Sequence, residues 1–144
     1  MSLKAQIDAY NVQKEAKLPA DVLALMNTTN AEVIAQHIKD KALQVGQKVT
    51  NFSLANHQGN TVELATLLKQ GPVIISFYRG GWCPYCNLEL KALNDYLPQF
   101  KAQNAQLIAI SPQLPDETLS TAQKNDLEFD VLSDVSNKIA KQFG

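Results

Sequence analysis

Residues 77–86 read Phe77-Tyr78-Arg79-Gly80-Gly81-Trp82-Cys83-Pro84-Tyr85-Cys86, and this stretch decides the fold of the chain. It completes an apolar, β-branched run that starts at Val73 and predicts a buried central strand. From Cys83 onward, apolar residues recur about every four positions, which is the period of a helix that buries one face. The stretch therefore predicts a strand, a Gly-Gly turn and a helix whose first turn carries Cys83 and Cys86.

The expected position of Cys83 and Cys86 suits them to redox chemistry. At the start of a helix, free backbone N–H groups and the helix dipole favour a thiolate over a thiol. The i, i+3 spacing places both sulfurs on one face, close enough to form a local disulfide. The pair also follows the carboxyl end of the predicted strand, where open α/β sheets commonly bind ligands. These points favour a thiol–disulfide oxidoreductase.

Several side chains near the dithiol are candidates for supporting roles. Arg79 could lower a cysteine pKa through its positive charge, or it could be a solvated loop arginine. Trp82 could shield and shape the dithiol, or it could serve packing alone. Glu89 lies one helical turn after Cys86, where it could shuttle a proton or simply be an exposed helix residue. Tyr78 is assigned to the core rather than to catalysis.

The alternatives to redox chemistry are two buried, inert cysteines or half of a zinc site. The chain has only two histidines, His37 and His57, and their spacing does not resemble that of a ligand pair. Neither is expected to be a general base. No metal or other cofactor is therefore predicted.

The segment before the strand divides into a helical part and a hairpin. Residues 1–45 are predicted to form a helical N-terminal extension, in which Pro19 starts a second helix and Thr29 with Glu32 forms a capping box for a third. Residues 46–144 are predicted to form the main domain. It would open with a hairpin around the turn at 57–60, followed by a short helical turn near 64–68.

The segment after the dithiol alternates between helix and strand. Pro98 is expected to kink or break the first long helix. A buried strand at 107–110, a helix from Pro115 and a short strand at 129–132 should follow, and Asp134 or Ser136 would cap a last helix. Strand, helix and strand in this order imply a right-handed parallel crossover. The fold class is therefore α/β.

The composition is that of an ordinary globular protein, with 45% hydrophobic residues, 19% charged residues and a formal net charge of -1. This near-neutral charge predicts no basic surface that would bind nucleic acid or an anionic membrane. Polar residues follow Lys4 where a signal peptide would need an apolar region. With both cysteines in one Cys-x-x-Cys, a cytoplasmic location is predicted.

Residues 77–90 resemble the peroxiredoxin-like branch of the alkyl hydroperoxide reductase and thiol-specific antioxidant (AhpC/TSA) superfamily, and the likeness extends over most of the chain from Gly46. It implies a thioredoxin-like, three-layer fold around a central mixed sheet. Typical peroxiredoxins carry, in order, a Pro, a Thr or Ser, the peroxidatic Cys and often a Glu. When Phe77-Tyr78 is aligned with the Phe-Tyr of the family, Arg79 takes the place of the Pro and Cys83 that of the Thr or Ser. Cys86 then corresponds to the peroxidatic Cys and Glu89 to the Glu.

The resemblance implies that the protein reduces peroxides, with Cys86 attacking and Cys83 resolving. A thioredoxin or glutathione system would return the disulfide to the dithiol. The same residues also resemble a thioredoxin site, Trp-Cys-x-x-Cys, in which Cys83 is the exposed nucleophile and Cys86 resolves. The dipeptide Pro84-Tyr85 is the one found in glutaredoxins. This second reading implies a protein disulfide reductase without peroxidase activity, and a third is a non-catalytic binding or scaffold fragment.

Thioredoxin-like domains also place a cis-proline loop beside the dithiol, followed by a closing hairpin and a last helix. Pro98, Pro112 and Pro115 all precede the position where that segment should begin. The closing C-terminal hairpin and helix are therefore expected to be absent, as in a truncated domain. Exposed strand edges and a tendency to associate would follow, and a homodimer could supply the missing edge.

Overall fold

The structure is a computed structural model that describes residues 1–144, and the chain divides into two compact units. One unit comprises Met1–Lys48 with Phe143–Gly144, and the other comprises Val49–Gln142. None of the helices combines the length and the apolar character that crossing a bilayer requires. Both cysteines lie in the second unit.

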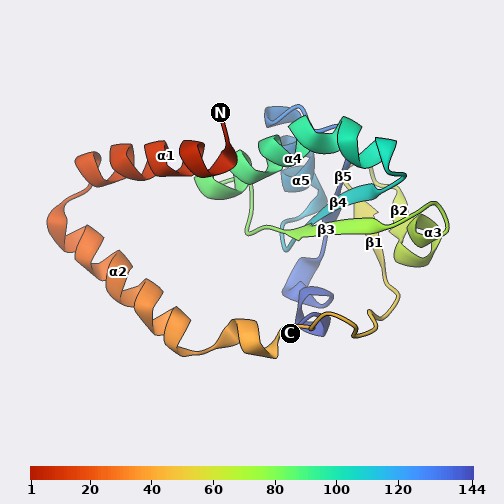
Figure 1. Cartoon of the computed structure of the whole chain (residues 1–144), viewed down its shortest axis with the longest axis horizontal. Coiled ribbons are helices and arrows are strands. Elements are labelled where there is room, and N and C mark those ends of the chain that lie inside the picture. The colour runs from red at the N-terminus through yellow and green to blue at the C-terminus, as the bar shows by residue number, and fades with distance from the viewer. The chain divides into compact units, whose positions relative to one another are not determined.

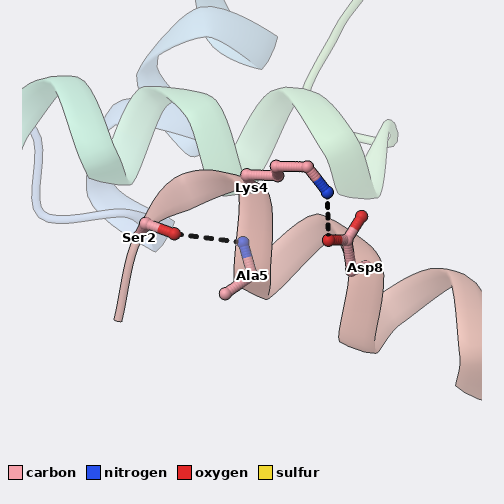
Figure 2. Close-up of polar contacts among 4 residues, drawn as sticks. All are labelled: Ser2, Lys4, Ala5 and Asp8. Atoms are coloured by element: carbon pink, nitrogen blue, oxygen red, sulfur yellow. Dashed lines mark hydrogen bonds and ion pairs between the residues drawn. The ribbon is translucent and has the colours of Figure 1, made fainter.

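The first unit is helical and consists of α1 (Leu3–Lys17), α2 (Ala20–Ala35) and the 3₁₀ turn η1 (Ile38–Lys41). Figure 2 shows how α1 begins: the hydroxyl of Ser2 accepts a hydrogen bond from the N–H of Ala5 at 3.3 Å. An exposed ion pair between Lys4 and Asp8 spans the next turn. Such a pair adds little stability, so the serine cap is the main local signal for the start of this helix.

The prediction of a separate helix starting at Thr29 is wrong, because α2 continues through this position. The Thr29 hydroxyl donates a hydrogen bond to the carbonyl of Leu25, one turn earlier, at 3.0 Å. A threonine can bond backward in this way within a helix instead of capping the N–H groups that follow it. Glu32, its expected partner in the capping box, is an exposed residue of the same helix.

The second unit is an α/β domain built on a five-stranded mixed sheet with the order β2-β1-β5-β4-β3 (Figure 1). β3, β4 and β5 are parallel, whereas β1 pairs antiparallel with both β2 and β5. The elements in chain order are β1 (Ser53–Asn56), β2 (Thr61–Glu63), α3 (Leu64–Leu68), β3 (Val73–Phe77), α4 (Pro84–Ala102), β4 (Gln106–Ser111), α5 (Pro115–Lys124), β5 (Asp130–Ser133) and the 3₁₀ turns η2 (Val135–Asn137) and η3 (Ala140–Gln142).

Alternate residues of the inner strands point to the two faces of the sheet and are buried on both. On one face, Leu107 and Ala109 of β4 pack in a cluster with Leu90 of α4. α4 and α5 lie on this same side of the sheet in Figure 1. The intervening residues Ile108 and Ile110 are each 1% exposed, so the opposite face is covered as well. The predicted α/β class with a central mixed sheet is confirmed.

β3 is an edge strand, and the prediction of a buried central strand at this position is wrong. It pairs only with β4, and Phe77 keeps 39% of its surface exposed. β4 and β5 occupy the centre instead. An apolar run identifies a strand with at least one covered face, but it does not reveal how many neighbours the strand has.

Two further expectations about the C-terminal half need correction. α4 continues through Pro98, which lies inside the helix near its end and removes one backbone hydrogen bond without ending the helix. The helix expected after Asp134 is replaced by η2 and η3. The buried carboxylate of Asp134 accepts hydrogen bonds from the N–H groups of Ile139 and Ala140, both at 2.9 Å, and so organises this segment.

Candidate active site

Cys83 is the N-cap residue of α4, and Cys86 lies in the first turn of that helix. Pro84 occupies the first helical position, where a missing N–H costs nothing and the fixed φ suits the helix. The Sγ of Cys83 accepts a hydrogen bond from the N–H of Cys86 at 3.3 Å. The sulfur thus takes the place of the usual capping oxygen, and a thiolate there gains from the helix dipole.

Arg79, the only arginine of the chain, places its guanidinium against the sulfur atoms. Its Nη2 lies 3.1 Å from the Sγ of Cys83, and the side chain also donates to Cys86. The guanidinium carbon lies 5.3 Å from the ring centroid of Trp82, within the range of a cation–π contact. Trp82 itself is 67% exposed.

The two thiols differ in acidity. Burial alone raises the pKa of Cys83, but hydrogen bonds from the Cys86 thiol, the Cys86 N–H and Arg79 outweigh it and bring the pKa below its ordinary value. Burial raises the pKa of Cys86, and the hydrogen bond that its thiol gives to Cys83 raises this pKa further. The first proton lost from the pair therefore leaves the negative charge on Cys83.

The two sulfurs also differ in access to solvent. Both cysteines are free; Cys83 is 0% exposed, whereas Cys86 is half-buried. The resemblance to a thioredoxin site implies that Cys83 is exposed, and the structure shows instead that it is buried. Cys83 is enclosed because its sulfur caps the helix and contacts Arg79 at the same time.

The turn that precedes the helix requires glycine at two positions. Gly80 has a φ of +155°, and a Cβ there would lie 2.4 Å from the Nε1 of Trp82. A Cβ on Gly81 would lie 2.3 Å from the Oγ1 of Thr121 in α5. Only a residue without a side chain lets the backbone come this close to its neighbours.

Two amide side chains hold this turn, Asn87 from the following helix and Gln113 from the loop after β4. The N–H of Gly81 donates to the Oε1 of Gln113, and the carbonyl of Gly81 accepts from the Nδ2 of Asn87, each at 2.8 Å. Asn87 also donates to the carbonyl of Cys83 at 3.0 Å, and its own Oδ1 accepts from Asn125 at 2.8 Å. Sequence reasoning missed these residues. The signal that could have found Gln113 is its place just after β4, since the carboxyl ends of parallel strands share one edge.

The remaining predicted residues lie in or beside the elements that carry the thiol pair. The carboxylate of Glu89 accepts a hydrogen bond from the hydroxyl of Ser76 at 3.3 Å and so joins α4 to β3. Tyr85 is half-buried in the first turn of α4. Tyr78 belongs to the core cluster as predicted. Its hydroxyl lies near the side chains of Ser111 and Thr121, which lower its pKa, but burial outweighs them and raises it.

An apolar cavity of about 380 Å³ adjoins this site at the carboxyl ends of β3 and β4. Its walls include Phe77, Ile110 and Pro112. Arg79 also lines the cavity, so one guanidinium faces both the cavity and the thiol pair. A group bound there would lie within reach of the arginine that polarises the sulfurs.

Residues 45–144 match the family model described as the AhpC/TSA family. The chain belongs to the AhpC/TSA family. This AhpC/TSA chain is 34% identical over 99 residues to the chloroplastic peroxiredoxin Q of Populus jackii, an alignment covering 69% of the chain and 46% of the relative. It is 28% identical over 107 residues to the thiol-disulfide oxidoreductase ResA of Bacillus cereus, covering 74% of the chain and 61% of the relative.

Among solved structures, the AhpC/TSA chain is similar to the peroxidoxin BcpB of Mycobacterium tuberculosis, with a TM-score of 0.69 and 28% identity over 71% of the chain and 66% of BcpB. A peroxiredoxin Q of Xanthomonas campestris matches in fold, with a TM-score of 0.60 and 22% identity over 64% of the chain and 58% of that structure. The chain thus spans about half to two thirds of the length of these relatives. The family and the thioredoxin-like fold predicted from residues 77–90 are confirmed.

Proposed function

We propose that this AhpC/TSA chain reduces hydroperoxides through a dithiol–disulfide cycle in which Cys86 attacks the peroxide and Cys83 resolves. The observation that carries the proposal is the asymmetry of the pair. Solvent reaches Cys86, while Cys83 is a buried, acidic thiol in hydrogen-bond contact with it. The similarity to peroxiredoxin Q supports the choice of peroxide as substrate.

The cycle has two chemical steps before reduction. The Cys86 thiolate attacks the terminal oxygen of the hydroperoxide, an S–O bond forms as the O–O bond breaks, and the departing alkoxide takes a proton to become an alcohol. Cys86 is thereby oxidised to a sulfenic acid. The Cys83 thiolate then attacks the Cys86 sulfur, the S–S bond forms, and hydroxide leaves as water after protonation.

A dithiol or two monothiols must then reduce the disulfide, and we propose a thioredoxin or a glutathione system for this step. A reducing, cytoplasmic setting suits a cycle that starts from two free thiols. Arg79 would bind the peroxide oxygens from its position beside both sulfurs and the apolar cavity. Pro84 and Tyr85 shape the first turn of α4, and Glu89, in the next turn, anchors the helix to β3.

The test is the fate of each cysteine after one equivalent of hydrogen peroxide. In the wild-type protein we expect an intramolecular Cys83–Cys86 disulfide, detected by mass spectrometry. In a Cys83→Ser variant we expect a sulfenic acid on Cys86, trapped with dimedone. The matched variant Cys86→Ser should show no trapped sulfenic acid on Cys83 on the same timescale, because that sulfur is buried. A trapped product on Cys83 alone would contradict the assigned roles.

One specific observation favours a second function, reduction of protein disulfides. Cys83 is the more acidic thiol and stands where thioredoxin-like sites have their nucleophile, and the chain is similar to ResA. Rapid reduction of insulin with no sulfenic acid on Cys86 would support this function instead. A protein inert to both peroxide and insulin would be a binding or scaffold fragment.

A further inference from the structure

We propose that Cys83 is also the proton relay of the peroxide reaction: it accepts the proton of Cys86, returns it to the departing oxygen, and only then attacks the sulfenic acid. This inference rests on the proposed function, because it concerns the first step of the same cycle. It gives Cys83 three successive roles, as base, acid and nucleophile.

The starting point is where the proton and the charge lie before attack. The Sγ of Cys83 accepts hydrogen bonds from Arg79 at 3.1 Å and from the Cys86 N–H at 3.3 Å, so the negative charge lies on Cys83 once the pair has lost one proton. In that state the half-buried Cys86 keeps the second proton, and its thiol donates a hydrogen bond to Cys83. The accessible sulfur is therefore the less nucleophilic one, and it must lose a proton to attack.

Few side chains near Cys86 can take that proton. The Arg79 guanidinium is already fully protonated. Tyr78 lies in the cluster against which Cys86 packs, but its hydroxyl is a neutral donor because burial raises its pKa. Glu89 is exposed and accepts a hydrogen bond from Ser76. The Sγ of Cys83 is thus the acceptor that Cys86 already faces.

The relay balances in atoms and charge. As Cys86 attacks, its proton passes to Cys83, an S–O bond forms and the O–O bond breaks. The alkoxide that leaves takes the proton from Cys83 and departs as an alcohol. Cys83 is a thiolate again, and it attacks the Cys86 sulfenic acid to form the disulfide and expel hydroxide. No group outside the pair needs to supply or remove a proton until this last step.

The identity of residue 83 matters because a hydroxyl cannot perform the relay. Serine at this position would accept the same capping hydrogen bond from the Cys86 N–H, so Cys83→Ser should preserve the helix start. Its hydroxyl can donate a hydrogen bond, but it does not exchange a proton with a thiol near neutral pH. The variant therefore separates capping from proton transfer.

The decisive measurement is the rate at which Cys83→Ser consumes one equivalent of oxidant in a single turnover. Removing Cys83 removes the hydrogen bond and the charge that raise the pKa of Cys86, so this variant has more Cys86 thiolate at neutral pH. A purely resolving Cys83 predicts an unchanged or faster first step. The relay predicts a rate lower by roughly 10²-fold with tert-butyl hydroperoxide, the usual scale of general acid–base catalysis.

A change of leaving group isolates the acid half of the relay. Peracetic acid releases a carboxylate, which departs without being protonated, whereas tert-butyl hydroperoxide releases a strongly basic alkoxide. The loss of rate in Cys83→Ser should therefore be much smaller with peracetic acid. Near-ultraviolet circular dichroism and a second variant, Cys83→Ala, control for misfolding, and both variants should show the same dependence on the oxidant.

Two results would overturn the relay: a wild-type rate in Cys83→Ser with tert-butyl hydroperoxide, or an equal loss of rate with both oxidants. These results leave the proposed function intact, because Cys86 still becomes a sulfenic acid. If the wild-type protein consumes neither oxidant, the proposed function fails and the relay fails with it.

Discussion

Arg79 is one of the groups that lower the pKa of Cys83, since its guanidinium contacts Cys83 at 3.1 Å and also donates to Cys86. Replacing it in Arg79→Met removes a positive charge and charge-assisted hydrogen bonds but keeps a long apolar side chain. We expect the pKa of Cys83 to rise towards that of an ordinary thiol. The oxidation rate at neutral pH should fall by roughly a hundredfold to a thousandfold, the scale for losing one such donor.

The measurement is a pH titration of thiolate absorbance in the ultraviolet, paired with peroxide consumption at neutral pH. Lys101→Met is a suitable control, because it removes a positive charge from α4 far along the helix from the cysteines. An unchanged thiol titration in Arg79→Met would show that Arg79 does not stabilise the thiolate.

The lowered pKa of Cys83 also makes the stability of the fold depend on pH. In the unfolded chain a thiol ionises at about pH 8.5, so between the folded pKa and this value unfolding takes up a proton. The free energy of unfolding therefore increases with pH across this interval, and this contribution is lost as the pH falls through the folded pKa. The pKa of Cys86 is raised, so ionisation of this thiol lowers the free energy of unfolding as the pH increases above the pKa of an unfolded thiol.

Urea unfolding under reducing conditions, repeated from about pH 6 to about pH 8.5, checks this dependence. The wild-type midpoint should increase across the series, and the increase should be smaller in Cys83→Ser. Equal slopes in the two proteins would assign the pH dependence to other groups.

How much of the site the sequence predicts depends on how local each contact is. Cys83, Cys86, Arg79 and Trp82 lie within a few residues of one another, so a strand, a glycine turn and a helix were enough to bring them together. Gln113 reaches the same turn from the loop after β4, and Asn125, at the end of α5, donates to the Asn87 side chain that holds the turn. Their amide groups belong to no motif, and only the packing of α5 against the turn brings them into hydrogen-bond range.

At the scale of elements, the contact between the glycine turn and α5 is tight enough to test. Gly81→Ala would place a Cβ 2.3 Å from the Oγ1 of Thr121, so one of the two elements must shift. We expect a loss of about 1–3 kcal/mol in the free energy of unfolding, the usual cost of overpacking. The turn carries the capping cysteine, so the pKa of Cys83 should change as well.

A double-mutant cycle with Thr121→Ala distinguishes this contact from general strain. Without the Oγ1, Gly81→Ala should lower the free energy of unfolding by less, which gives a coupling energy of about 0.5 kcal/mol or more. Purely additive effects would mean that the turn and α5 are not in contact in solution.

The order of helices and strands in the second unit was predictable, because each has a clear apolar period and each boundary has a glycine or a proline. The edge position of β3 in the sheet was not predictable, since the period of a strand carries no information about its neighbours. The continuity of α2 through Thr29 and of α4 through Pro98 was also missed. Local signals for a helix start or stop are weak, and in α4 the packing of an apolar face outweighs one lost hydrogen bond.

At the scale of the whole molecule, the core and the thiol pair both lie within Val49–Gln142. The helices of the first unit, by contrast, contain no buried residues. We therefore expect a protein from which residues 1–48 are deleted to unfold cooperatively and to form the Cys83–Cys86 disulfide with peroxide. Thermal unfolding and mass spectrometry of the oxidised product check both points. A deletion variant with no cooperative transition would show that the first unit supports the core.

The edge position of β3 determines how the protein behaves in a concentrated stock. No other strand pairs with its outer side, and residues 73–77 carry no charged side chain that would repel a neighbour. Strands of this kind seed side-by-side association between molecules. Turbidity and loss during storage should therefore increase with protein concentration even when the thiols are kept reduced, and Ile75→Lys, which adds a charge to the strand, should extend the shelf life of the preparation.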